Sequence, residues 1–205
     1  MLHMDNIIPD HLQTLDIDHP VWERFFMVAP LVLVGTREPD GGFDLAPKHM
    51  AMPMSWQNHY GFVCAPHHRT YQNLRREGGF TVSFPSPKQI VLTSLAADAR
   101  AEDGSKPALQ ALPTFPSKTV DGILVKNAYL YLECELHRII DDLGDNSLII
   151  GRIVAAHVDR DAMRSAERDD QDLIHHAPLL AYLYPGRFAT IEESFSFPFP
   201  SGFTR

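Results

Sequence analysis

The chain has 205 residues, 44% of them hydrophobic, and a formal net charge of −8. This length supports one large domain with a sizeable core, and the acidic balance argues against a duplex nucleic-acid binder or an electrostatic membrane binder. No run approaches the roughly 18 apolar residues of a membrane span, and the N-terminus lacks the apolar core of a signal peptide. Cys64 and Cys134 lie in strand-like runs outside any C-x-x-C pair, so reduced thiols and a cytoplasmic location are expected.

The chain begins with a segment that is expected to lie outside the main domain. Residues 1–29 are predicted to form an N-terminal arm with one amphipathic helix at "PVWERFFMV", residues 20–28. Residues 30–190 are predicted to form the main domain, and residues 191–205 a C-terminal tail. In the domain, "PLVLVGTREPDGGFDLAP" (30–47) has an apolar strand, a turn at "PDGG" and a second strand, which is typical of a hairpin.

Within residues 43–66, "FDLAPKHMAMPMSWQNHYGFVCAP", two predicted strands are connected by small and flexible residues, which are Ala46, Pro47, Met50, Ala51, Met52 and Met54. The connection has few polar side chains with which to satisfy its own backbone. A planar ring could lie along it, hydrogen-bonded to backbone N–H and C=O groups while methionines pack against the ring. The alternative is a methionine-rich turn in the core.

Residues 64–85, "CAPHHRTYQNLRREGGFTVSFP", are predicted to form a strand end, about two turns of helix closed by Gly78 and Gly79, and another strand. Thr70 is predicted to be the helix N-cap. The basic residues 67–69 crowd the positive end of the helix dipole, where cations are unfavourable unless an anion lies between. A phosphate held by the Arg69 guanidinium, the Thr70 hydroxyl and the Asn73 amide would account for them. The alternative is a loop with basic side chains in solvent and Thr70 serving only as a cap.

The second half of the chain is predicted to be mainly β. Residues 98–122 form a long excursion with one helical turn around "PALQAL". Residues 128–140 and 147–159 form a second hairpin, in which Leu130, Leu132, Cys134 and Leu136 share one face and Tyr129, Tyr131, Glu133 and Glu135 the other. Residues 160–172 are predicted as a solvated helix or loop, and 184–205 as an aromatic strand with a proline-rich end. Many short strands and few helices indicate a barrel or sandwich.

Several common catalytic and binding motifs do not occur in the sequence. There is no G-x-G-x-x-G, P-loop, H-E-x-x-H or G-x-S-x-G, which argues against a doubly wound dinucleotide fold. The doublets His67/His68 and His175/His176 are poor metal sites because adjacent side chains on an extended chain point to opposite faces. No metal is expected.

Taken together, the segments "PLVLVGT", "DGGFDLAPKHMAMPMSW", "YGFVCAPHHRTYQNLRREGGFTVSFP", "LYLECELHRII", "GDNSLIIGRIVAAHVD" and "APLLAYLYPGRF" resemble the flavin reductase-like family of FMN-binding split-barrel flavoproteins. The resemblance runs from about Pro30 to about Phe188. It includes an N-x-A-P-like loop, an R-T-x-x-N segment, a C-E-L strand and a G-x-I-V strand followed by H-V-D. It implies a mainly β fold with a few helices, a split β-barrel of Greek-key type, and a homodimer with flavin near the subunit interface.

The resemblance also implies which residues hold the flavin. The segment from Ala46 to Met52 would lie along the isoalloxazine ring, and Arg69, Thr70 and Asn73 would hold the phosphate, as the dipole argument also suggests. Lys48 and His49 could donate hydrogen bonds to the ring, although many relatives have Ser or Thr in place of His49. The predicted cofactor-binding residues are Ala46, Pro47, Lys48, His49, Met50, Ala51, Met52, Arg69, Thr70 and Asn73. No catalytic residue is assigned, because the flavin carries the chemistry.

The leading functional hypothesis is an NAD(P)H-dependent flavin reductase, in which hydride passes from the C4 of NADH or NADPH to flavin N5. FMN is the expected flavin, with FAD as the alternative. Two other functions remain open: a tightly bound FMN electron carrier reduced by a protein partner, and a non-enzymatic protein that binds flavin or another planar ligand. The expected partners are a second copy of the chain and a monooxygenase or other electron acceptor. The dimer is also expected because the strands, the excursion at 98–122 and the aromatic tail would expose much apolar surface.

Overall fold

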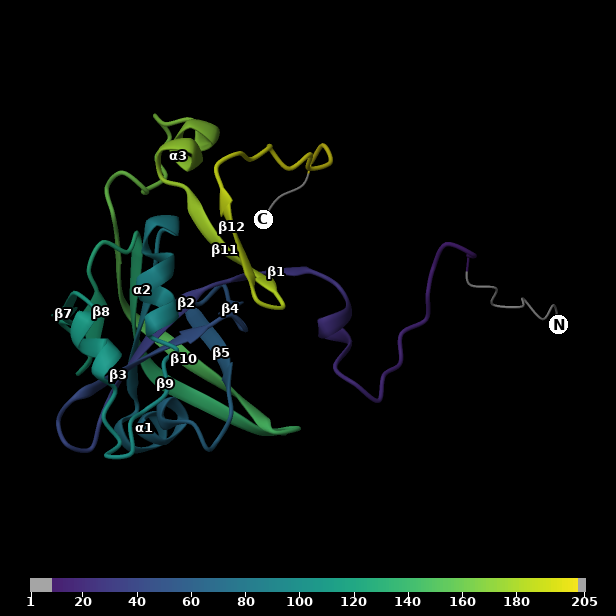
Figure 1. Cartoon of the computed structure of the whole chain (residues 1–205). Helices are drawn as coiled ribbons and strands as arrows, with labels where there is room; N and C mark the ends of the chain where they lie inside the picture. The colour runs from purple at the N-terminus through teal and green to yellow at the C-terminus, as the bar shows by residue number, and fades with distance from the viewer. Residues whose placement is uncertain (1–8, 203–205) are drawn as a thin grey trace.

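The computed structural model describes residues 9–202 and contains a curled antiparallel sheet of seven strands (Figure 1). The strand order across this sheet is β3, β2, β6, β9, β10, β5, β4. The strands are β2 (Val32–Arg37), β3 (Phe43–Lys48), β4 (Ala51–Ser55), β5 (His59–Cys64), β6 (Gly79–Phe84), β9 (Leu130–Leu143) and β10 (Asn146–Val158). Smaller sheets are formed by β1 (Met27–Pro30), β11 (Leu179–Tyr184) and β12 (Arg187–Ile191), and by β7 (Thr114–Pro116) and β8 (Ile123–Val125).

Three α-helices lie outside the sheets: α1 (Arg69–Glu77), α2 (Ile90–Leu95) and α3 (Asp170–His176). Short 3-10 helices cover Val21–Arg24, Pro87–Gln89 and Pro107–Ala111. The helix α1 is the one expected between two strands, and Gly78 ends it with a φ of 70°, a backbone conformation that glycine adopts without strain. Within residues 9–202, no helix combines the length and apolar character that a membrane crossing requires.

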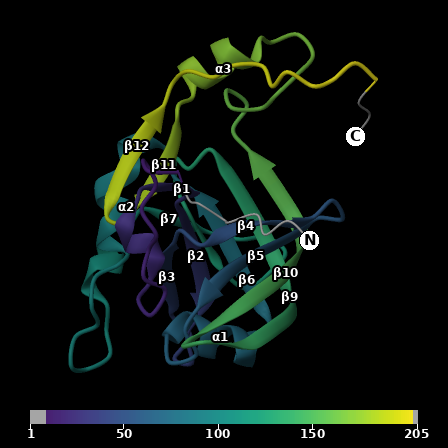
Figure 2. The ribbon, with the colours of Figure 1, turned by 90° about the vertical axis from the view of Figure 1, so that its right-hand side faces the viewer.

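Both predicted hairpins are confirmed. Strands β2 and β3 pair antiparallel from Val32 opposite Lys48 to Arg37 opposite Phe43, across the "PDGG" turn. Strands β9 and β10 form the longest hairpin, which Figure 2 shows running along one side of the sheet. Gly151 in β10 permits a close approach here, because a Cβ at this position would clash with the Phe80 ring. The main hydrophobic core includes residues of these two strands and of their neighbours, among them Phe62, Leu74, Phe80 and Ile149.

The sheet curls so far that its two edges meet at one short link. Strands β3 and β4 are consecutive in the chain but lie at opposite ends of the strand order, and only His49 and Met50 join them. The N–H of Val63 in β5 donates to the carbonyl of Met50 at 2.9 Å. The small and flexible residues around 46–54 were expected to connect two strands, but most of them lie within strands, in the end of β3 and in β4. Pro53 is tolerated because β4 is an edge strand.

The prediction of an amphipathic helix at residues 20–28 is also wrong. Only Val21–Arg24 is helical, in a 3-10 turn, and Phe25 is extended with a φ of −152°. Met27–Pro30 then pairs with β11, so the aromatic and β-branched character of "FFMVAP" favours a strand here. Residues 9–20 extend away from the body of the molecule in Figure 1. The first eight residues of the predicted arm lie outside the described residues.

The excursion at residues 98–122 packs back onto the sheet. It contains the expected helical turn at 107–111, and β7 pairs with β8 just after it. Leu112 is buried in a second core cluster with Leu33, Leu45 and Val125. The excursion therefore covers apolar surface, contrary to the expectation that it would expose it. Helix α2, which precedes the excursion, was not expected from the sequence. Residues 160–169, predicted as a solvated helix or loop, form a loop. The Asp169 side chain then caps the N-terminus of α3.

Burial of Glu133 follows from this packing. Simple alternation along β9 places Glu133 on the face opposite Cys134, yet both side chains are fully buried. The Glu133 carboxylate accepts hydrogen bonds from the backbone N–H groups of Lys118, Thr119 and Val120, with N–O distances of 2.6–3.2 Å. His157 Nε2 lies 3.5 Å from Oε1. Burial acts to raise the pKa of Glu133, but the backbone hydrogen bonds outweigh it and the pKa is lowered.

Candidate functional site

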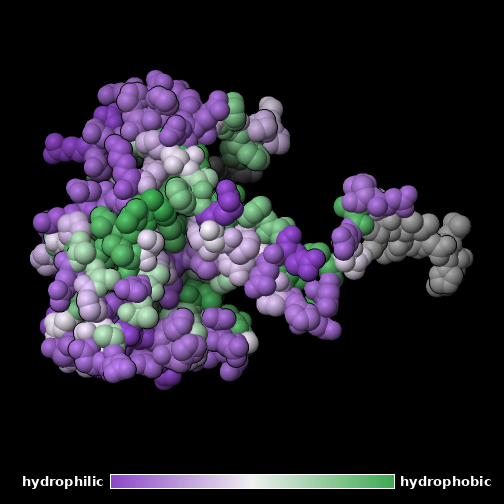
Figure 3. Space-filling model, in the orientation of Figure 1, coloured by the Kyte–Doolittle hydropathy of each residue, from purple (hydrophilic) through white to green (hydrophobic). Residues whose placement is uncertain are grey.

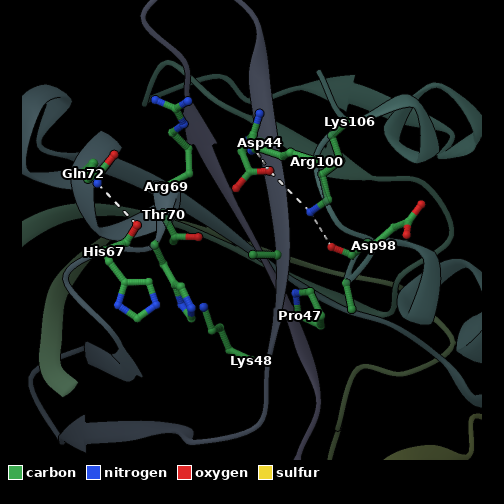
Figure 4. Close-up of a pocket in the computed structure, with 14 residues that line it drawn as sticks. Asp44, Pro47, Lys48, His67, Arg69, Thr70, Gln72, Asp98, Arg100 and Lys106 are labelled. Atoms are coloured by element: carbon green, nitrogen blue, oxygen red, sulfur yellow. Dashed lines mark hydrogen bonds and ion pairs between the residues drawn. The ribbon is translucent and has the colours of Figure 1, made fainter. Parts of the chain in front are cut away.

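A cleft of about 510 Å³ lies between β3, the start of α1 and the segment after α2 (Figure 4). We call it the basic cleft. Its lining residues are Asp44, Ala46, Pro47, Lys48, His67, His68, Arg69, Thr70, Gln72, Ala96, Ala97, Asp98, Arg100 and Lys106. Five of the ten residues predicted from the sequence are among them: Ala46, Pro47, Lys48, Arg69 and Thr70. The structure therefore brings the predicted ring segment and the predicted phosphate segment to one cavity.

The N-terminus of α1 opens at this cleft without a side-chain cap. The N-cap residue is His68, and its side chain accepts no hydrogen bond from the first turn. Thr70 is the second residue of the helix and is buried, so its predicted role as N-cap is wrong. The reason is a turn just before it, in which the His68 N–H donates to the Ala65 carbonyl and starts the helix earlier. The Thr70 hydroxyl forms no side-chain hydrogen bond within residues 9–202 and lines the cleft.

Two acidic residues neutralise part of the positive charge. The Glu38 carboxylate forms ion pairs with two guanidinium groups, those of Arg69 and Arg100. The distance from Arg69 Nε to Glu38 Oε2 is 3.6 Å. Asp44 pairs with Arg100 and Lys106 at 2.9 and 3.5 Å. Lys106 also donates to the carbonyls of Leu45 and Ala96, so this ammonium ties the segment after α2 to β3. Burial lowers the pKa of Lys106, and Asp44 acts in the opposite direction.

The remaining basic side chains have no carboxylate partner within the described part of the chain. They are Lys48, His67 and His68, from the end of β3 and the residues just before α1. Lys48 Nζ donates to the buried Cys64 Sγ at 3.4 Å. Partial burial and the neighbouring charges of Lys48 and His67 lower the pKa of His68. The Lys48 ammonium and two basic imidazole rings beside an uncapped helix N-terminus suit an anion.

The other five predicted residues lie elsewhere. Asn73 is fully buried; its amide donates to Thr36 Oγ1 at 3.0 Å and accepts from Arg76 at 3.1 Å. It is therefore occupied within the fold and does not line the basic cleft. Ala51 is buried in β4, whereas Met50 and Met52 are exposed. His49 lines a neighbouring cleft, described below.

The lining residues of the basic cleft that the sequence did not predict include Arg100 and Lys106. Both lie in the predicted excursion, more than 50 positions from the residues they contact in Glu38 and Asp44. The stretch "DARAEDGSKP" mixes both signs of charge, which is also the composition of an ordinary solvated loop. A buried cluster of ion pairs is not distinguishable from it by composition.

Comparison with known proteins identifies the family. Residues 24–191 match the family model described as "Flavin reductase like domain". An uncharacterized protein of Methanothermobacter thermautotrophicus is 26% identical over 138 residues, 64% of each chain, so this chain spans less than two thirds of that relative's length.

Solved structures share the fold at low sequence identity. Flavoredoxin of Desulfovibrio vulgaris (Miyazaki F) has a TM-score of 0.73 at 20% identity, covering 93% of this chain and 100% of its own. Nitrilotriacetate monooxygenase component B from Bacillus cereus has a TM-score of 0.75 at 20% identity, covering 96% and 100%. The predicted mainly β split-barrel class is confirmed, and the chain belongs to the flavin reductase-like family.

Proposed function

We propose that this protein is an NAD(P)H-dependent flavin reductase that binds FMN with its phosphate in the basic cleft. The observation that supports this is the uncapped N-terminus of α1 beside Lys48, His67 and His68, which lack carboxylate partners among the described residues. A dianionic phosphate would compensate both the helix dipole and the Lys48 charge, and it would favour the protonated form of His68. A cleft of about 510 Å³ is within the usual size range of small-molecule sites.

The residues of the cleft would then divide the work of binding. The Thr70 hydroxyl and the Arg69 guanidinium would hold the phosphate, with Arg69 giving up part of its contact with Glu38. Ala46, Pro47 and Lys48, at the end of β3, would lie along the ring system. Bound FMN supplies the capacity to accept hydride from a reduced nicotinamide, so the chain needs to bind and orient its ligands and to exclude water. Asn73 is not part of this proposed set, because its amide is already hydrogen-bonded.

The test of the phosphate assignment compares two flavins. Arg69→Ala is expected to weaken FMN binding by about 1.5 to 3 kcal/mol, the range for a hydrogen bond to a charged group, with the lower end favoured because Glu38 competes for Arg69. Riboflavin, which lacks the phosphate, should bind wild type and variant equally in a fluorescence titration. Arg75→Ala, which removes the same charge from the last turn of α1, is the matched control and should leave both affinities unchanged. Equal losses for FMN and riboflavin would show that Arg69 supports the fold and not the phosphate.

The donor is tested by mixing the flavin-loaded protein rapidly with NADH or NADPH. Fast loss of the visible flavin absorption with either nucleotide supports the reductase. No loss with either nucleotide contradicts it and favours the electron carrier or the non-enzymatic binder. A protein that neither carries a flavin nor quenches the fluorescence of added FMN would contradict the whole assignment.

We also propose a cytoplasmic homodimer that delivers electrons to a monooxygenase or another acceptor. The exposed apolar side chains of β4 and the following turn support the dimer: Met52 is 59% exposed and Trp56 is 88% exposed. The free, buried thiols of Cys64 and Cys134 are consistent with a reducing compartment.

A further inference from the structure

A second cleft, of about 520 Å³, lies between α2, the end of β3 and the hairpin of β11 and β12. We call it the His49 cleft. Its walls are mostly apolar, with Leu31, Pro47, Ile90, Val91 and Phe188 among the lining residues. Figure 3 shows a hydrophobic patch over α2, where Val91 is largely exposed. The cleft shares Pro47 and Ala97 with the basic cleft, so the two cavities are neighbours.

Two residues that line this cleft each have a buried polar atom without a hydrogen-bond partner among the described residues. Thr93 is 1% exposed, and its Oγ1 is unpartnered within residues 9–202. The Nε2 atom of His49 is likewise buried and unpartnered, and its ring packs against those of Tyr182 and Tyr184 with centroid distances of 4.7 and 5.3 Å. Burial, reinforced by the charge of Lys48, lowers the pKa of His49, which favours the neutral ring. Buried polar groups are rarely left without a partner, because an unpaired buried donor or acceptor destabilises the fold.

The rim of the cleft carries a cation. Arg187, at the start of β12, is exposed and forms no ion pair in the part of the chain that the structure describes. The lining residues include no acidic side chain. A ligand with a negative charge at the mouth of the cleft and a polar group at its interior end would therefore match all three features.

We infer that the His49 cleft binds a single-ring aromatic carboxylate that carries a ring hydroxyl group. The hydroxyl would pair with Thr93 and His49, the ring would pack against Pro47 and Phe188, and the carboxylate would meet Arg187. This goes beyond the proposed function, because binding here requires no flavin. Only the consequence that the ring would lie beside the flavin rests on that function.

The test is a calorimetric titration of the purified full-length protein, with and without FMN, using 3- and 4-hydroxybenzoate, benzoate and phenol. At least one hydroxybenzoate should bind more tightly than both benzoate and phenol. Thr93→Val, which keeps the side-chain shape, should weaken that hydroxybenzoate about tenfold and leave benzoate unchanged. It should also raise the Tm of the ligand-free protein, because an unsatisfied buried hydroxyl is removed. Arg187→Gln should weaken both carboxylates and leave phenol unchanged.

Ser94→Ala is the matched control. Ser94 lines the same cleft from the same helix, but its hydroxyl already donates to the Val91 carbonyl, so its loss should not change ligand affinity. Unchanged hydroxybenzoate affinity in Thr93→Val, or a lowered Tm in that variant, would assign Thr93 to the fold alone and overturn the inference. Competition between hydroxybenzoate and FMN would make the cleft part of the flavin site and overturn it equally. Hydroxybenzoate binding to a protein that binds no flavin would leave this inference standing and refute the proposed function.

Discussion

Replacement of Glu133 by Gln should destabilise the protein strongly, although the two side chains have nearly the same shape. The Glu133 carboxylate accepts hydrogen bonds from three consecutive backbone N–H groups, at Lys118, Thr119 and Val120, and is fully buried. All three donors reach Glu133 Oε2, and Lys118 N–H also reaches Oε1, so a Gln carbonyl can take the Oε2 position while its NH₂ group is turned toward the Lys118 N–H. We expect a loss of about 2–4 kcal/mol, because charge-assisted bonds become neutral ones and two donors face each other in a buried site.

The measurement is urea denaturation followed by circular dichroism. Glu135→Gln is the matched control, since Glu135 lies two residues along the same strand, is 55% exposed and forms a surface ion pair with Arg152. Its loss should cost no more than about 1 kcal/mol. Amide hydrogen exchange adds a local readout: the N–H groups of residues 118–120 should exchange faster in Glu133→Gln and not in Glu135→Gln. Equal denaturation midpoints for the two variants would refute the reasoning.

The pH dependence of this difference has a definite sign. The pKa of Glu133 in the folded protein is lowered, and the unfolded value is about 4.3. The stabilisation is therefore fully present above about pH 4.3 and is lost as the pH falls through the lower folded pKa. The gap between wild type and Glu133→Gln should be constant near neutrality and should shrink under more acidic conditions. A gap that grows with acid would contradict the lowered pKa.

Two further predictions concern ligand binding and assembly. The pKa of His68 is lowered by partial burial, Lys48 and His67 in the free protein, and a bound phosphate would raise it, so FMN binding should take up a proton and tighten as the pH falls from about 8 to 6.5. His68→Gln should flatten this dependence in a fluorescence titration, and a similar slope for riboflavin would contradict the phosphate assignment. Trp56→Lys should shift the proposed dimer toward monomer in light scattering, whereas Trp22→Lys, in the N-terminal segment, should not; a dimer of unchanged stability would exclude the β4 edge as the interface.

The sequence predicted the local elements well, because their signals are local. The "PDGG" turn defines the β2–β3 hairpin, and Gly78 marks the end of α1. What it could not predict depends on contacts between distant residues. Glu133 follows the alternation of an exposed strand face, and only the return of residues 117–122 buries it.

The candidate site shows the same division. Ala46, Pro47, Lys48, Arg69 and Thr70 were predicted and do line one cleft. Asn73, one turn along α1, has an amide that could bind a phosphate, but this amide donates its hydrogen bond to Thr36, 37 positions away. Arg100 and Lys106 enter the cleft through ion pairs with Glu38 and Asp44 that no local pattern signals.

The two-residue link at His49 and Met50 has a consequence for how the chain folds. Strands that follow each other so closely usually pair as a hairpin, which closes a short loop at little entropic cost. Here β3 and β4 lie at opposite ends of the strand order, so they reach this arrangement only when the five intervening strands have assembled. The pairings between these two edges, such as β2 with β6, β6 with β9 and β10 with β5, join strands that are far apart in the sequence. Such non-local pairing slows folding. We therefore expect the β9–β10 hairpin to form early and the meeting of the two edges to complete the barrel last.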